Sequence, residues 1–252
     1  MRSLFLCVFF LVCFQLVNSQ TVLYAAARNG LSIRQDPSST ATVLDKIPYG
    51  QKLEVPAETP NENPVSTEGF RGNWVKVTYN GKTGFIVNSY LLPLPPPKAG
   101  TKDLREYLSQ VGVANAKPMV LKYGKNNDDG FGQTVLTKQW YTNGAEWHIY
   151  EGYEYGSETA IIPQFNVQQA YLLLRLIKSY PLIIGEADAF PIKNATVKKA
   201  NSGKTITVEK EVYTESNFYI KKIKYEVDDG VIYNLEIYEL DNQAVIYFNG
   251  GV

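Results

Sequence analysis

A run of prolines divides this chain. Four of the ten residues at 91–100 are proline, and Gly100 closes the run. Such a stretch cannot form a helix or a central strand, and it adopts stiff, extended polyproline geometry. It could also be a ligand for a polyproline-reading domain. We therefore expect one domain at 20–92, a proline-rich linker at 93–100 and a second domain at 101–252.

The first nineteen residues read as an export signal. A basic start precedes an apolar run at 4–14, and the small residues Val17 and Ser19 precede the expected cut near Gln20. The apolar run is shorter than the roughly 20 residues that a helix needs to cross a bilayer. The pattern predicts a signal peptide at 1–19 and no membrane span. We expect an exported protein of the periplasm or the extracellular space, with outer-membrane association as an option.

Both cysteines, Cys7 and Cys13, lie inside this signal. The mature chain would therefore hold no disulfide and no thiol nucleophile, which excludes a cysteine peptidase. Cys13 lies within the apolar run rather than after it, so a lipid anchor is a minority option. The chain has 25 basic and 25 acidic residues, which indicates neither nucleic acid nor an anionic membrane as a partner.

The segment 21–92 alternates short apolar stretches with turn residues. Its strongest feature is the pair of alternating stretches 74–79 and 82–87, which flank Asn80 and Gly81. Asn-Gly between two such stretches is typical of a two-residue hairpin turn. With further strands expected near 31–34, 43–47 and 53–55, the segment predicts a small all-β barrel.

The residues of this barrel resemble the bacterial SH3-like domain. The family commonly carries a start of the form L-N-V-R, a K-G turn and a hairpin of the form G-W-x-K-V-x-Y-N-G-K-x-G-Y-V. The matching segments here are 31–38, 43–50 and 73–91. Two departures are the pair at 35–36, where serine-glycine is usual, and a longer loop at 56–72. The resemblance implies a non-catalytic module that docks exported bacterial proteins to cell-wall peptide or to another protein.

The second domain mixes helices and strands. Asn166 and Gln169 form a capping-box pair at the start of a long apolar helix, which Pro181 is expected to end. The remaining expected elements are a helix at 101–109, strands at 118–123, 133–141, 146–155 and 205–213, and a closing meander at 219–248. The predicted fold class is therefore multi-domain: a small all-β SH3-like barrel followed by an α+β domain with an antiparallel sheet.

The sequence offers few side chains in patterns that are typical of catalytic sites. A zinc site in a chain without cysteine needs two or three histidines, and His148 is the single one. No serine lies in a nucleophile-elbow pattern. Glycoside hydrolysis needs only two acids, and Glu146, Glu151, Glu154 and Glu158 surround an aromatic stretch that could stack on sugars. A solvated strand face explains the same pattern. We expect no enzyme, no metal and no cofactor.

The leading hypothesis is an exported, non-catalytic binding or assembly protein whose partner is a peptidoglycan peptide or an envelope protein. The alternatives are a carboxylate-dependent glycoside hydrolase or sugar-binding activity in the second domain, and a purely structural envelope protein. The candidate ligand-binding residues are Trp74, Tyr79, Phe85, Tyr90, Trp140, Trp147, His148 and Tyr150. The enlarged loop at 56–72 is a further candidate surface, because recognition often varies in loops on a rigid barrel.

Overall fold

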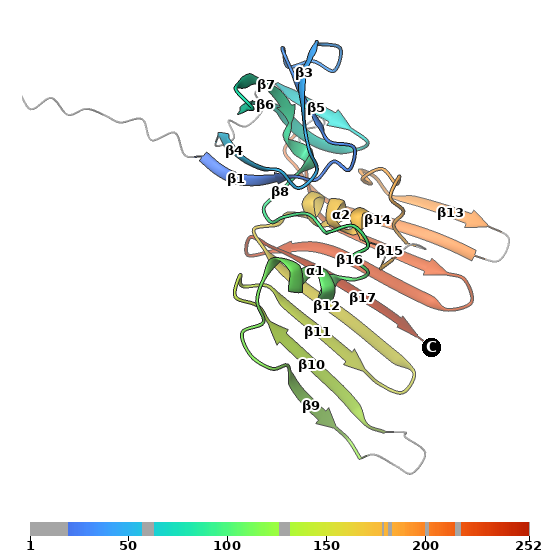
Figure 1. The fold of residues 1–252 in the computed structure, drawn as a ribbon. Coiled ribbons are helices and arrows are strands. Elements are labelled where there is room, and N and C mark those ends of the chain that lie inside the picture. The colour runs from blue at the N-terminus through green and yellow to red at the C-terminus, as the bar shows by residue number, and fades with distance from the viewer. Residues whose placement is uncertain are drawn as a thin grey trace, which may run out of the picture.

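A computed structural model of the protein describes residues 20–56, 63–125, 132–177, 179–180, 183–199, 202–214 and 218–251. The chain is mostly β, with antiparallel sheets and few helices (Figure 1). The predicted signal peptide at 1–19 lies outside the described residues.

Two small antiparallel sheets form the N-terminal barrel. Their strand orders are β4-β1-β8 and β3-β2-β7-β6-β5. The elements are β1 (Gln20–Ala25), β2 (Leu31–Arg34), β3 (Val43–Ile47), β4 (Lys52–Pro56), β5 (Pro64–Thr67), β6 (Phe70–Tyr79), β7 (Lys82–Val87), the 3-10 helix η1 (Asn88–Tyr90) and β8 (Leu91–Leu92). The predicted hairpin turn is confirmed, because Asn80 and Gly81 both have positive φ, at 50° and 73°. The barrel has its own core, centred on Ile33, Ile47 and Ile86.

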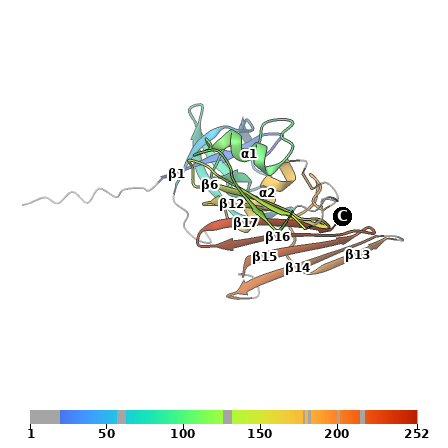
Figure 2. The same cartoon turned by 90° about the horizontal axis from the view of Figure 1, so that it is seen from below.

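A nine-stranded antiparallel sheet forms most of the rest of the chain. Its order is β13-β14-β15-β16-β17-β12-β11-β10-β9. The strands are β9 (Met119–Tyr123), β10 (Thr134–Trp140), β11 (Glu146–Glu151), β12 (Tyr155–Pro163), β13 (Ala195–Lys199), β14 (Ser202–Val212), β15 (Phe218–Asp228), β16 (Ile232–Leu240) and β17 (Gln243–Gly251). The helices α1 (Leu104–Val111) and α2 (Val167–Leu176) lie on the same side of this sheet as the barrel (Figure 2).

The capping box predicted for α2 is confirmed. The Asn166 side chain accepts from the Gln169 backbone N–H, and the Gln169 side chain accepts from the Asn166 backbone N–H. The predicted end at Pro181 is wrong, because α2 stops at Leu176 and Ile177 is extended. Arg28 from the barrel donates to the Leu176 carbonyl at 2.7 Å, so a distant residue satisfies one of the final carbonyls of the helix.

The strand predicted at 146–155 is also wrong in its end, because a turn at 152–154 separates β11 from β12, which starts at Tyr155. β11 ends at Glu151, and the Gly152 N–H donates to the Tyr155 carbonyl at 2.8 Å to close a tight turn into β12. The pattern of aromatic and acidic residues does not change at the turn, so no local signal indicates that a strand ends there. The first predicted helix starts later than 101, because the Asp103 side chain caps it by accepting from the Glu106 N–H.

Besides its own core, the barrel contributes residues to the hydrophobic core of the large sheet. Ala26, Phe70 and Leu92 of the barrel belong to the same buried cluster as α1, α2 and the central strands of the sheet. The proline segment is packed in place as well: the Tyr49 hydroxyl donates to the Pro97 carbonyl at 2.8 Å, and Pro97 is buried. The barrel is therefore held against the sheet by contacts on several segments.

Candidate functional site

An open seam runs along the barrel between β4 and β6. On the β4 side, every described ladder pairs the strand with β1. The second half of β6, from Trp74 to Tyr79, is paired with β7, and β5 reaches only Phe70 to Asn73. β4 and β6 are neighbours in space, but no ladder joins them within the described strands. Two strand edges therefore face each other without a ladder between them.

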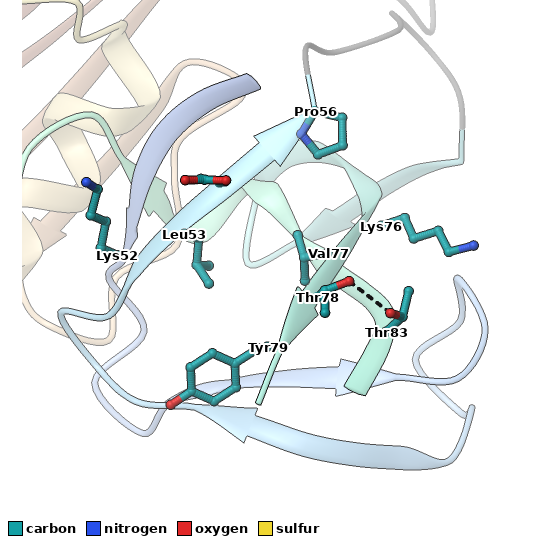
Figure 3. Close-up of a pocket in the computed structure, with 9 residues that line it drawn as sticks. Lys52, Leu53, Pro56, Lys76, Val77, Thr78, Tyr79 and Thr83 are labelled. Atoms are coloured by element: carbon teal, nitrogen blue, oxygen red, sulfur yellow. Dashed lines mark hydrogen bonds between the residues drawn. The ribbon is translucent and has the colours of Figure 1, made fainter. Parts of the chain in front are cut away.

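A hollow of about 560 Å³ lies along this seam. Leu53 and Val77 lie at its centre, with Tyr79 at one end, while Lys52 and Lys76 extend to opposite sides (Figure 3). Glu54, Pro56, Thr78 and Thr83 complete its lining, and the hydroxyls of the two threonines are hydrogen-bonded at 2.8 Å. The floor is apolar, and the described lining carries two basic residues and one acidic residue.

Of the four candidate aromatic residues in the barrel, Tyr79 is the one that lines this hollow. Trp74 is buried on the β6–β7 hairpin, and Phe85 lies opposite Arg34 where β7 meets β2. Tyr90 packs on Phe70, with ring centroids 5.7 Å apart, and burial raises the pKa of its hydroxyl to about 12. Leu53, Lys52 and Lys76 were missed as candidates, because ordinary alternation on a strand gives no local sign that its edge is unpaired.

The enlarged loop makes an internal contact. Residues 57–62 lie outside the described residues, and the rest forms the β5–β6 hairpin. The Arg71 N–H donates to the Gln168 side chain at 2.7 Å, and Gln168 donates back to the Arg71 carbonyl at 3.2 Å. The hairpin tip carries Glu68, whose carboxylate lies 2.9 Å from Arg175 of α2. The described part of the loop therefore binds to α2 in the second half of the same chain.

A second hollow at the barrel–sheet junction has an internal use. It measures about 520 Å³ and is lined by Arg28, Glu68, Arg175 and Glu186 among others. Arg28 pairs with Glu186 at 2.8 Å, and Arg175 donates to both the Glu68 carboxylate and the Glu186 carbonyl. These charges pair with one another within the junction, so the residues of this hollow hold the barrel against the rest of the chain.

The candidates in the sheet separate onto its two faces. Trp140, His148 and Tyr150 share the face opposite the helices, whereas Trp147 lies on the covered face, as the alternation predicts. The His148 ring is 2.9 Å from Glu146 and lies edge-on to Trp140 at 6.4 Å. Burial lowers the pKa of His148, and the hydrogen bond to Glu146 acts in the opposite direction.

The four candidate glutamates are not one cluster. Glu146 is engaged by His148 on the open face, and Glu154 is exposed in the β11–β12 turn. Glu151 and Glu158 line one hollow of about 540 Å³ on the opposite face. Glu158 accepts from the Trp147 indole N–H at 2.7 Å and from the Tyr180 hydroxyl at 2.6 Å.

The described segments contain neither a metal-binding cluster nor a membrane-spanning helix. Nowhere in these segments do three or more His, Cys, Asp or Glu side chains gather closely enough to hold a metal ion. In the same segments, no helix has the length and apolar character needed to span a bilayer.

Comparison with known proteins assigns the first part of the chain. The family model described as the bacterial SH3 domain matches residues 29–91, from the turn before β2 to the start of β8. The C-terminal part matches no family model. No curated protein and no solved structure matches the chain.

Proposed function

Because residues 29–91 match the bacterial SH3 domain, we propose that this chain is an exported, non-catalytic binding protein. Its barrel takes an extended peptide along the seam between β4 and β6, and the peptide stem of peptidoglycan is the ligand. The observation that carries the proposal is the pair of strand edges that face one another without a ladder, across a hollow with an apolar floor.

The chemistry of the seam suits an extended, acidic peptide. Free strand edges bind extended chains through backbone hydrogen bonds, and side-chain pockets add selectivity. Leu53 and Val77, buried in the barrel core, form the floor beneath the ligand, and Tyr79 supplies a ring with a polar tip. Lys52 and Lys76, both exposed, place positive charge on either side of the floor, where they can meet the carboxylates of a stem peptide.

An envelope protein that presents an extended segment is the competing partner, and a cosedimentation experiment separates the two. Purified peptidoglycan is mixed with the chain lacking residues 1–19 and pelleted at low salt. We expect retention, and competition by a soluble stem peptide with free carboxylates. Absence of retention at low salt would contradict the peptidoglycan ligand, and a chain that instead copurifies with one envelope protein would support the competing partner.

A charge-matched pair of variants tests the seam itself. Lys52→Glu/Lys76→Glu reverses both basic residues of the hollow, and we expect retention to fall by about tenfold. Lys46→Glu/Lys122→Glu makes the same charge change at two exposed lysines outside the hollow, and should retain binding within about twofold. Equal losses in the two variants would show that binding follows net charge and does not use the seam.

The glycoside hydrolase alternative now rests on Glu151 and Glu158, because these two share a hollow. Two acids on one hollow are the minimum for such chemistry. The test is release of reducing ends from purified glycan strands. Activity that disappears in Glu158→Gln and survives in Glu146→Gln, on the opposite face, would support hydrolysis over binding alone.

A further inference from the structure

A gap in the side-chain layer of the large sheet creates the hollow around Glu158. Gly156 of β12 is paired directly with Gly250 of β17, and the neighbours of this pair in the same row are Glu151 and Tyr233. Two adjacent positions in the row therefore have no side chain. A Cβ atom on Gly250 would lie 2.7 Å from the Tyr233 ring, so a larger residue there would displace the ring that forms one wall.

The next row supplies the opposite wall. Glu158 lies between Ile149 of β11 and Phe248 of β17, to which it is directly paired. Phe248 is part of an aromatic group: its ring centroid is 4.9 Å from that of Tyr180 and 6.2 Å from that of Tyr233, with which it stacks. A carboxylate thus projects between an aliphatic side chain and a set of ring faces.

The Glu158 carboxylate is held by neutral donors. One oxygen accepts from Trp147 and the other from Tyr180, while burial and the neighbouring Glu158 raise the pKa of the Tyr180 hydroxyl far above its usual value. None of the ion pairs among the described residues includes Glu158. Arg105 is the cation stacked nearby, with its guanidinium 4.8 Å from the Trp147 ring centroid. The carboxylate is therefore fixed in position without a cationic partner.

The described charged residues that line this hollow are all acidic. Glu151 and Glu158 both contribute to it, and no lysine or arginine does among the described residues of the hollow. Carboxylates hydrogen-bond ammonium groups, ring faces attract cations, and the Ile149 and Phe248 side chains offer apolar contact to an alkyl chain. Together these features select a cation on a short aliphatic stem.

We propose that the hollow lined by Ile149, Glu158, Tyr233 and Phe248 binds a primary alkylammonium group, such as the side chain of a lysine-like residue in a partner peptide. The ammonium nitrogen donates to the Glu158 carboxylate, Glu151 adds attraction at the rim, and the alkyl chain covers the glycine pair. This site lies on the large sheet and is separate from the barrel seam.

A titration with two matched probes tests the site. Nα-acetyl-lysine methylamide carries the free ammonium, and the same compound acetylated on Nε has no charge. Binding is followed by NMR, with the Trp147 indole proton as the local reporter because it is hydrogen-bonded to Glu158. We expect a saturable shift of this proton with the charged probe, and about tenfold weaker binding with the acetylated one. Equal affinities, or no saturable shift with either probe, would overturn the proposal.

Variants separate this site from its surroundings. Glu158→Gln should weaken binding of the charged probe by about tenfold, and Glu146→Gln on the opposite face should leave it unchanged. If Glu158→Gln does not fold, Glu151→Gln at the exposed rim should still weaken binding by about threefold. Unchanged affinity in the folded Glu151 and Glu158 variants would overturn the proposal. Lys52→Glu/Lys76→Glu should leave this titration unaffected, so failure here is distinguishable from failure of the barrel proposal.

Discussion

Gly69 and Phe190 lie so close together that a Cβ atom on Gly69 would be 2.1 Å from the Phe190 carbonyl oxygen. The same approach lets the Phe190 N–H donate to the Glu68 carbonyl at 2.8 Å. The tip of the β5–β6 hairpin is therefore fastened backbone to backbone to a segment more than a hundred residues later. This contact makes the junction between barrel and sheet sensitive to single substitutions.

Gly69→Ala should lower the free energy of unfolding by about 3 kcal/mol or more, because it adds a backbone clash to the cost of a positive φ. Gly81→Ala is the matched control, with a similar φ of 73° and open space around it. The control should cost only the left-handed strain, about 1–2 kcal/mol. Urea unfolding measures both, and equal losses would show that the close approach of Phe190 adds nothing to the cost of a methyl group at Gly69.

Phe70→Ala should cost about 3–5 kcal/mol, because the ring is fully buried against Tyr90, Tyr171 and Phe190. Phe85→Ala, at a partly exposed site in the same barrel, should cost clearly less. Thermal unfolding followed at two wavelengths is the measurement. A Phe70→Ala loss no larger than that of Phe85→Ala would mean that the shared core contributes little.

Asn166→Ala should destabilise the protein by about 1 kcal/mol, because it removes the side-chain acceptor of the α2 capping box. Asn166→Asp keeps an acceptor at the same place and should recover most of the loss. Circular dichroism during urea unfolding reports both variants. If Asp recovers nothing, the cap is not the source of the effect.

His148 should make stability fall as the solution is acidified. Its pKa is lowered in the folded state, chiefly by burial, so below the ordinary value of 6.5 the unfolded chain binds the proton more readily. The contribution is fully present above pH 6.5 and is lost as the pH falls through the folded pKa. His148→Gln should show a shallower decline of the free energy of unfolding between pH 7 and about pH 5. Parallel curves for the two proteins would contradict this assignment.

Local signals predicted the local elements well. Asn80 and Gly81 specify their hairpin through the φ values that the turn requires, and Asn166 with Gln169 specifies the start of α2. These features depend on residues at most three apart in the chain. The end of α2 could not be predicted in the same way, because the contact at Leu176 comes from Arg28 in the barrel.

The candidate sites depend on register between distant segments, which no short pattern encodes. Gly156 and Gly250 are ordinary glycines until the sheet pairs them, and only then do they open a hollow. Tyr79 was found as an aromatic residue, but its neighbour Leu53 gains a role only because β4 is unpaired towards β6. Aromatic residues were therefore a partial guide to the sites.

The shared core also fixes distances on the surface. Because Phe70 and α2 join the barrel to the sheet in one buried cluster, the seam and the Glu158 hollow lie on parts of the protein that are packed against each other. A ligand that occupied both sites would have to be long enough to reach from one to the other at the separation that the fold sets. The avidity of such a ligand would then depend on the distance between its acidic segment and its amine. The protein would therefore select branched peptides by that distance.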